Sequence, residues 1–378
     1  MENVEKVKRG KKRKGSKGDK NSQRKKKNQP TEENSSSCEE ISTISIALPG
    51  TILENAHSLE LKTYLAGQIA RAACIYNIDE IVIYDDSGST VTASEDGAEE
   101  QNSRKGCCAQ MARILQYLEC PQYLRKFFFP LHRDLKFCGL LNPLDAPHHL
   151  RQNNNFIFRE GVVTEKPTKS GKGCHVNIGL RKDALVGETL TPGIRVTFKL
   201  PTEDVKEGKK VHGTVVSPAQ PRQETGVYWG YTVRMAESIS RVFSQSPYDD
   251  GYDLIIGTSD RGTNIHDIPA KTLSYNHAIV VFGGMMGIEY ALENDNALNA
   301  VDSELLFDKY INTAPNQGSR TIRTEEAVLI TLAGLQSKLQ AKNEAKEFNL
   351  FSSIPQSQDT KMPQGSGAKN SQNSLNQE

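Results

Sequence analysis

The segment formed by residues 312–335 constrains the fold more than any other part of this chain. It joins a strand-like run, residues 305–311, to a helix expected to begin near Thr321 or Thr324. Proline and glycine between the two elements predict a tight, irregular loop. The loop also holds polar side chains that a plain connector does not need, so we expect a ligand there: Asn312, Thr313, Gln317, Ser319, Arg320 and Arg323.

The helix that follows is apolar on nearly every face. Glu325 and Glu326 fall in its first turn, where carboxylates complement the positive end of the helix dipole. The later turns leave no wide polar stripe, because they are built from Val328, Leu329, Ile330, Leu332, Ala333 and Leu335. A helix without such a stripe is normally buried, so we expect this one in the core.

Three successive strands in this half of the chain end in loops of small and polar residues. The strands lie in residues 252–262, 277–289 and 305–313, and their loops read GTSDRG, FGGMMG and NTAPNQGSR. In a parallel sheet the carboxyl ends of the strands meet at one edge, where open α/β folds bind ligands. One glycine-rich loop is weak evidence, but three in succession predict a binding site at this edge.

The first half of the folded chain also alternates strands and helices. Residues 43–50 and 79–86 read as strands, and the second runs on without alternation, as in parallel strands covered on both faces. An acidic loop is expected over residues 87–102. Helical spacing is seen in Leu61, Leu65, Ile69 and Ala72 and again in Met111, Ile114, Leu115 and Leu118. This order predicts an α/β domain with a parallel sheet, in two parts over residues 41–150 and 236–342.

Short strand candidates crowd the middle of the chain. They lie in residues 156–164, 174–180, 193–200, 211–216 and 226–234. This spacing predicts a small β-barrel inserted over residues 151–235, of the oligonucleotide-binding (OB) type. Its basic and aromatic side chains are candidates for stacking bases and meeting phosphates: Arg195, Lys199, Tyr228, Trp229 and Tyr231. Trp229, the only tryptophan, is equally consistent with a place in the core.

The charge of the chain is unevenly distributed. Residues 1–27 hold thirteen Lys and Arg against three Asp and Glu, and the remainder holds 34 against 43. The body is therefore mildly acidic, and an RNA-binding face on it must be a local patch. Residues 1–40 and 343–378 are expected to be disordered tails, and the basic one fits a nuclear or nucleolar address.

Several chemistries and locations are not supported by the sequence. The seven cysteines form no CxxC pair, which indicates reduced thiols and no zinc site. Neither a GxxxxGK[ST] phosphate loop nor a GxGxxG dinucleotide motif is present, and Ser259 lies in no nucleophile elbow. His148 and His149 lack partners at metal-ligand spacing and are predicted to be structural or surface residues. No apolar run reaches the length of a membrane span, so no membrane partner is expected.

The three loops, together with AGQIARAACIYNIDEIVIYDD and LNPLDAPHHLRQ upstream, resemble the SPOUT class of RNA methyltransferases over residues 41–340. The similarity is to its eukaryotic and archaeal branch with an inserted OB barrel, which includes a centromere and spindle protein. The resemblance implies a parallel sheet with a C-terminal trefoil knot, S-adenosylmethionine as cofactor, and a homodimer. It also implies a ribosomal RNA substrate methylated at N3 of a uridine, and a nuclear or nucleolar location with spindle, centrosome and kinetochore partners in mitosis.

The resemblance also assigns residues to the cofactor pocket by position. One wall is Thr258, Ser259, Arg261 and Gly262, a second is Phe282, Gly283 and Gly284, and a third is Asn312, Thr313, Gln317, Gly318, Ser319 and Ile322. Arg320 and Arg323 are hypothesised to stabilise the uridine anion in catalysis. The three loops hold no histidine, so the sequence indicates no general base.

Two alternative functions stay open at this point. A non-enzymatic RNA-binding or spindle-associated protein would keep the pocket without turnover. In the other, the inserted barrel would bind structured RNA independently of methylation.

Overall fold

The structure is a computed structural model that describes residues 40–87, 95–168, 173–201, 211–298 and 303–346. The predicted tails, residues 1–40 and 343–378, lie almost entirely outside these ranges. All the described residues belong to one compact unit. None of the described helices is long and apolar enough to span a membrane.

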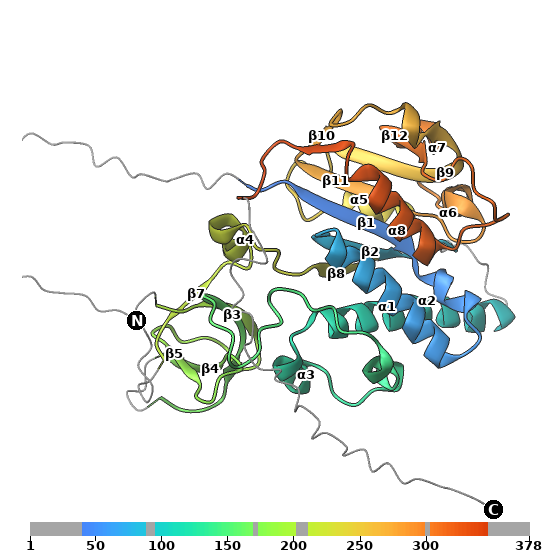
Figure 1. The fold of residues 1–378 in the computed structure, drawn as a ribbon. Coiled ribbons are helices and arrows are strands. Elements are labelled where there is room, and N and C mark those ends of the chain that lie inside the picture. Colours follow the sequence, from blue (N-terminus) through green and yellow to red (C-terminus); the bar gives the residue numbers. More distant parts are fainter. Residues whose placement is uncertain (1–39, 88–94, 169–172, 202–210, 299–302, 347–378) are drawn as a thin grey trace, which may run out of the picture. The chain divides into compact units, whose positions relative to one another are not determined.

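A six-stranded parallel sheet forms the centre of this unit (Figure 1). Its strands are β1 (Thr43–Pro49), β2 (Glu80–Tyr84), β8 (Thr232–Ala236), β9 (Leu254–Asn264), β11 (His277–Val281) and β12 (Lys309–Asn312). They are arranged in the order β12-β9-β11-β1-β2-β8, and every neighbouring pair is parallel. The predicted α/β class with a parallel sheet is confirmed.

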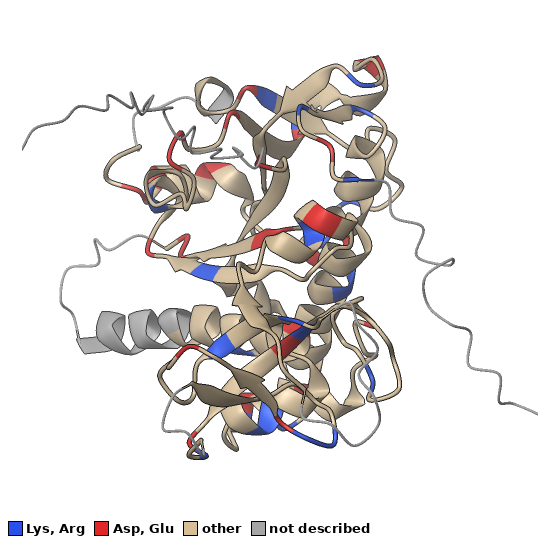
Figure 2. Cartoon of the chain, turned by 90° about the vertical axis from the view of Figure 1, so that its left-hand side faces the viewer, with Lys and Arg blue, Asp and Glu red and all other residues tan. Residues whose placement is uncertain are grey.

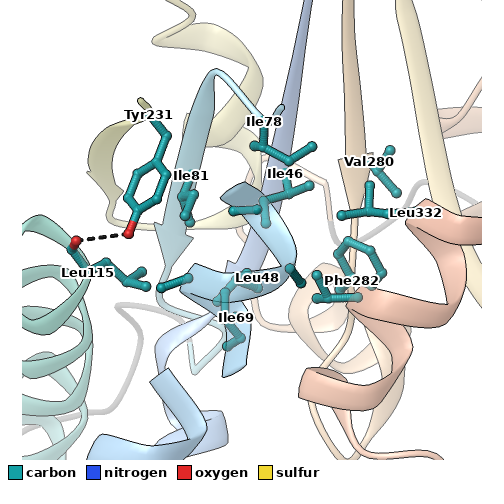
Figure 3. Packing of buried hydrophobic residues seen from close by; sticks show 14 of the residues in the cluster. Ile46, Leu48, Ile69, Ile78, Ile81, Leu115, Tyr231, Val280, Phe282 and Leu332 are labelled. Carbon is teal, nitrogen blue, oxygen red and sulfur yellow. Dashed lines mark hydrogen bonds between the residues drawn. The ribbon is translucent and has the colours of Figure 1, made fainter. Parts of the chain in front are cut away.

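Both faces of the sheet are covered by helices, which explains why its strands are almost wholly apolar. One face packs against α1 (Leu59–Ile75), α2 (Glu95–Glu119) and α8 (Thr324–Leu335), with Ile46, Leu48, Ile69, Leu115 and Leu332 in one buried cluster (Figure 3). The opposite face packs against α5 (Ile239–Ser244) and α6 (Gly287–Glu293), through residues such as Ala47, Val82 and Ile279. Successive residues of β1 and β2 thus alternate between two cores.

A five-stranded antiparallel sheet is inserted between α3 (Gln122–Phe128) and β8. Its strands are β3 (Phe158–Thr164), β4 (Cys174–Asn177), β5 (Ala184–Val186), β6 (Arg195–Lys199) and β7 (Thr214–Val216), in the order β5-β4-β3-β6-β7. The two edges meet, because Leu185 of β5 donates to the carbonyl of Val211 at 2.8 Å and accepts from the amide of Gly213 at 3.3 Å.

The prediction that residues 226–234 form a strand of the insertion is wrong. Only Thr232–Ala236 is a strand, and it pairs with β2 of the parallel sheet. Tyr228, Trp229 and Tyr231 are buried and donate hydrogen bonds to Ile78, Glu160 and Leu115, so they are core residues and no platform for bases. The fifth strand is β5, whose three residues are too few to show an alternating pattern.

Other boundaries also differ from the predictions. The expected loop over residues 87–102 gives way to α2 from Glu95, and the expected strand over residues 305–313 divides into α7 (Ser303–Leu306) and β12. The GTSDRG segment belongs to β9 itself. A small parallel pair, β10 (Leu273–Tyr275) with β13 (Leu339–Ala341), and the short helix α4 (Gln220–Thr225) were not predicted.

Helix α8 is only half buried, contrary to the expectation for an apolar helix. Val328, Leu332 and Leu335 face the core, whereas Leu329 and Ile330 are 45% and 38% exposed. One side of the helix packs on α1, whereas Leu329 and Ile330 on the other side stay exposed among the described residues.

The described cysteines, Cys74, Cys107, Cys108, Cys120, Cys138 and Cys174, are all free thiols, which confirms the prediction for them. Cys38 lies outside the described residues.

A buried polar network joins the insertion to the parallel-sheet domain. Arg195 of β6 donates two hydrogen bonds to Glu119 at the end of α2, at 2.6 and 2.9 Å, and one to Glu160 of β3 at 2.6 Å. Both histidines predicted to be structural lie here, and each ring Nε2 is within 2.9 Å of the Glu119 carbonyl oxygen. Burial raises the pKa of Glu119, but His148 and Arg195 outweigh it, and the pKa falls to about 2.

We expect His149 to make the protein less stable in mild acid. Burial and the neighbouring His148 lower the pKa of His149 from 6.5 to about 3, so below pH 6.5 the unfolded chain takes up a proton that the folded chain refuses. Stability is therefore full above pH 6.5 and falls as the pH drops towards 3. Between pH 7.5 and 5, wild type should lose about 2 kcal/mol more than His149→Gln, measured by urea unfolding. The exposed His132→Gln is the control, and parallel pH curves for wild type and His149→Gln would contradict the expectation.

Candidate active site

A cavity of about 790 Å³ opens at the carboxyl edge of the parallel sheet. Three predicted segments line it, at the ends of β9, β11 and β12. A fourth wall comes from the turn after β1. The volume lies within the range of pockets that enclose a cofactor-sized molecule.

Most of the residues predicted for the site meet in this cavity. Those that line it are Thr258, Ser259, Arg261, Phe282, Gly283, Gly284, Asn312, Thr313, Gln317, Arg320, Ile322 and Arg323. Gly262, Gly318 and Ser319 do not line it.

Gly262 instead allows two strands to approach closely. A Cβ built on it would stand 2.6 to 2.8 Å from backbone atoms of Ile311 and Asn312 in β12. Only glycine lets β12 lie so near β9, and the register of the two strands shifts at this point. Gly262 therefore sets the position of Asn312. A Cβ on Gly318 would meet nothing within 4 Å, so that position tolerates a side chain.

Asn312 connects the first and third walls. Its side-chain nitrogen donates to the carbonyl of Asp260 in β9 at 2.8 Å, and its side-chain oxygen accepts from the amide of Ala314 at 3.0 Å. The amide thus closes the turn that follows β12 and ties that turn to β9. Both groups of the amide are used, so neither aspartate nor alanine replaces it fully.

The loop between β12 and α8 is fixed at both ends. Thr324, the first residue of α8, donates to the carbonyl of Gly283 at 2.9 Å, and Thr313 bonds the hydroxyl of Thr331 at 2.9 Å. The amide of Arg323 donates to Glu326 at 3.0 Å and caps the helix. These contacts hold the third wall against the second.

The second wall is tightly packed. Gly283 leaves no room for a side chain, because a Cβ there would lie 2.5 Å from backbone atoms of Gly287 and Ile288. Tyr84 donates to the carbonyl of Phe282 at 2.6 Å, and burial raises the pKa of Tyr84 well above 10, which keeps it a neutral donor. The carbonyls of Phe282 and Gly283 are thus engaged by Tyr84 and Thr324, which fixes the backbone of this wall.

Sequence reasoning missed the fourth wall and part of the second. Glu54, Asn55 and His57 follow β1, and Met285, Met286 and Glu289 follow β11; all line the cavity. In the structure β1 neighbours β11, so its carboxyl end reaches the same edge of the sheet. Only the β12-β9-β11-β1 order, which the sequence does not give, identifies that neighbour.

The cavity carries charges of both signs. Arg261, Arg320 and Arg323 stand among Glu54, Asp260 and Glu289, the last of which accepts a hydrogen bond from Tyr310 at 2.9 Å. Within the described ranges no group of three or more His, Cys, Asp or Glu is arranged to hold a metal ion. The arrangement suits a ligand that has both an anionic and a cationic group, placed next to a second, anionic molecule.

A family model described as "Putative RNA methyltransferase" matches residues 43–335, most of the chain. The match spans the parallel sheet, the insertion and all four walls of the cavity.

Several curated animal proteins that share one name are similar to this chain. The 28S rRNA (uridine-N(3))-methyltransferase of Drosophila melanogaster is 54% identical over 84% of this chain and 67% of its own length. The proteins of the same name from Mus musculus and Homo sapiens are 55% and 52% identical, over 79% of this chain and 77% and 78% of theirs. A solved structure of a "putative methyltransferase" from Legionella pneumophila with bound SAM aligns over 79% of this chain and 67% of its own, but a TM-score of 0.28 at 8% identity carries no argument.

Proposed function

Because the chain belongs to the RNA methyltransferase family whose model it matches, we propose that it transfers a methyl group from S-adenosylmethionine to N3 of a uridine in 28S ribosomal RNA. The observation that carries the proposal is one cavity bounded by the ends of β9, β11 and β12, with β1 as a fourth side. Relatives at 52–55% identity that bear this activity in their name supply the substrate.

The residues present fit the proposed cofactor. Gly283 and Gly284 line the cavity without side chains, so an adenosine can approach the backbone there, and the Asn312 amide nitrogen keeps a second N–H for a ribose. Arg261 is a bidentate donor for the amino-acid carboxylate. When bound, the cofactor supplies a methyl group already activated by its sulfonium.

The protein's own task is then alignment and charge control. The N3–H bond of uridine must break and its proton pass to solvent water, while N3 gains the methyl carbon and S-adenosylhomocysteine departs. Arg320 and Arg323 line the cavity and are proposed to stabilise the uridine anion that forms when the proton leaves. The target uridine must be unpaired or flipped, because N3 is engaged in a base pair.

Three structural features belong to the same proposal. The loop from β12 to α8, held by the Thr324 and Thr313 bonds, is proposed to thread as a trefoil knot. The inserted sheet, whose edges meet at Leu185, is proposed to be an OB-type barrel. The exposed apolar side of α8, with Leu329 and Ile330, is proposed as a homodimer interface. Spindle or kinetochore proteins and a nuclear or nucleolar location stay predictions.

Asn312→Ala should reduce methyl transfer about 100-fold while the protein stays folded, because both ends of the amide hold the third wall in place. The test compares ribosomal RNA nucleosides by mass spectrometry from cells with the protein, without it, and with the variant in its place. We expect one 3-methyluridine to disappear on depletion and to be restored by wild type alone. Full restoration by Asn312→Ala would contradict the assignment of this residue, and an unchanged profile on depletion would favour a non-enzymatic protein.

A further inference from the structure

The basic residues predicted to contact RNA in the insertion are already used within the chain. Arg195 is bound by Glu119 and Glu160, and Lys199 binds Glu224 at 2.7 Å. Figure 2 shows basic and acidic segments next to one another over this side of the molecule. A phosphate would have to compete with carboxylates already in place, so these side chains are poor anchors for RNA.

A different surface combines unpaired cations with exposed apolar side chains. It lies on α3 and the two 3₁₀ turns that follow, η2 (Arg133–Leu135) and η3 (Cys138–Leu140), in the region below α2 in Figure 1. Its exposed members are Lys126, Phe127, Leu131, Arg133, Lys136 and Leu140. We call this set the α3–η3 surface.

The cations of the α3–η3 surface form no ion pair with any described residue. The single acid among them, Asp134, is buried and is bound by Arg113 and, at 3.3 Å, by His132. Its charge is thus neutralised inside the protein. In a body with 43 acids to 34 bases, three exposed, unpaired cations on one short segment are a marked local excess.

The apolar members are exposed to an unusual degree. Leu131 and Leu140 are 105% and 77% exposed, and Phe127 is 44% exposed with the ammonium of Lys126 4.9 Å from its ring centre. Isolated exposed apolar residues are ordinary, but an aromatic ring among unpaired cations is the combination that binds unstacked bases and their phosphates.

The segment is held firmly in place. Arg71 of α1 donates to the carbonyls of Pro143 and Leu144, and Leu141 packs against Gly67 of the same helix. The guanidinium of Arg125 donates hydrogen bonds to the carbonyls of Cys120 and Leu118 at the end of α2. The exposed side chains therefore project from a fixed backbone.

The α3–η3 surface and the cavity both adjoin α1. His57, two residues before α1 begins at Leu59, lines the cavity, and η2 packs against α1. We therefore expect a strand of RNA that leaves the cavity along α1 to reach these cations.

We propose that the α3–η3 surface binds the single-stranded RNA that flanks the target uridine, with phosphates on Lys126, Arg133 and Lys136 and an unstacked base against Phe127 and Leu131. This inference rests on the proposed function. RNA is favoured over an acidic protein segment because a loop that exposes uridine N3 also exposes neighbouring bases, which use the aromatic ring.

The test measures affinity of the full chain for a fluorescein-labelled oligouridylate of about twelve nucleotides, by anisotropy at several salt concentrations. Neutralising the three cations together (Lys126→Gln, Arg133→Gln, Lys136→Gln) should weaken binding at least about tenfold and reduce the salt slope by about 2, since each phosphate contact on a single strand contributes about 0.7. Phe127→Ala should weaken binding about fivefold or more. The matched control neutralises three exposed cations elsewhere, Arg181, Arg241 and Lys309.

Calorimetry of S-adenosylhomocysteine binding distinguishes failure of the proposed cofactor site from failure of the proposed RNA-binding surface. Failure of wild type to bind it would overturn the proposed cofactor site. Normal binding of it, together with an RNA affinity and salt slope unchanged in the triple variant, would overturn the α3–η3 proposal. A third result would also overturn it: the triple variant weakens binding to polyglutamate as much as binding to the oligouridylate, and Phe127→Ala has no effect on either. The surface would then fit an acidic protein segment.

Discussion

Replacing Arg195 by methionine is expected to lower the free energy of unfolding by about 3–5 kcal/mol, a fall in Tm of about 10 °C for a chain of this size. The Arg195 guanidinium bonds two buried carboxylates, Glu119 and Glu160, which are 7% and 3% exposed. Without it, Glu119 keeps only His148, and Glu160 keeps only the neutral donors Thr197 and Trp229, so buried negative charge between the insertion and the parallel sheet loses its permanent counter-charge. Thermal and urea unfolding measure the loss.

Two further variants show whether the buried charges cause that loss. Lys166→Met removes an ion pair with Asp183 in the same inserted sheet, but the lysine is 66% exposed, so the loss should stay below about 1 kcal/mol. Glu119→Gln added to Arg195→Met should recover a good part of the stability, since one buried charge is then removed. A loss from Arg195→Met no larger than that from Lys166→Met would refute the explanation.

Gly262→Ala is expected to reduce methyl transfer and S-adenosylhomocysteine binding by about 100-fold, with the overall fold retained. The added Cβ would meet the backbone of Ile311 and Asn312 at 2.6 to 2.8 Å, too close for any real contact. Strand β12 is at the edge of the sheet and has room to shift. We therefore expect the added Cβ to displace Asn312 and Thr313 from their places in the cavity wall without unfolding the protein. Single-turnover kinetics and calorimetry measure the two effects.

Gly318→Ala is the matched control in the same part of the chain. Its Cβ would meet nothing within 4 Å and its residue does not line the cavity, so activity should stay within about threefold of wild type. If Gly318→Ala were as damaging as Gly262→Ala, the loop itself and not the approach of two strands would be the sensitive feature.

The elements most reliably predicted were those whose pattern is local. The strands of residues 43–50 and 79–86 and the helix around Met111 and Leu115 were identified by unbroken apolar runs and helical spacing, and each is buried as expected. The errors arose where contacts with residues far away in the sequence decide which structure a segment adopts. Residues 226–234 look like another short strand of the insertion, but their aromatic side chains find hydrogen-bond acceptors in Ile78, Glu160 and Leu115.

The candidate site also divides into residues that local sequence patterns identified and residues that only long-range contacts place there. Loop composition identified the ends of β9, β11 and β12, but not Glu54, Asn55 and His57, because the turn after β1 becomes a wall only through the strand order. Composition also grouped Gly262 with the cavity, whereas its contact with β12 requires the two strands to lie side by side.

The sequence by itself determined the α/β class and the three loops that meet at one sheet edge, because hydrophobic periodicity and turn residues act over a few positions. Only the tertiary structure decided which cations remain unpaired and which apolar residues remain exposed. Arg195 finds its carboxylate Glu119 76 positions away, whereas Lys126 and Lys136 have no such partner among the described residues. Charge pairing and burial depend on which residues are neighbours in space, and the order of residues along the chain does not by itself specify those neighbours.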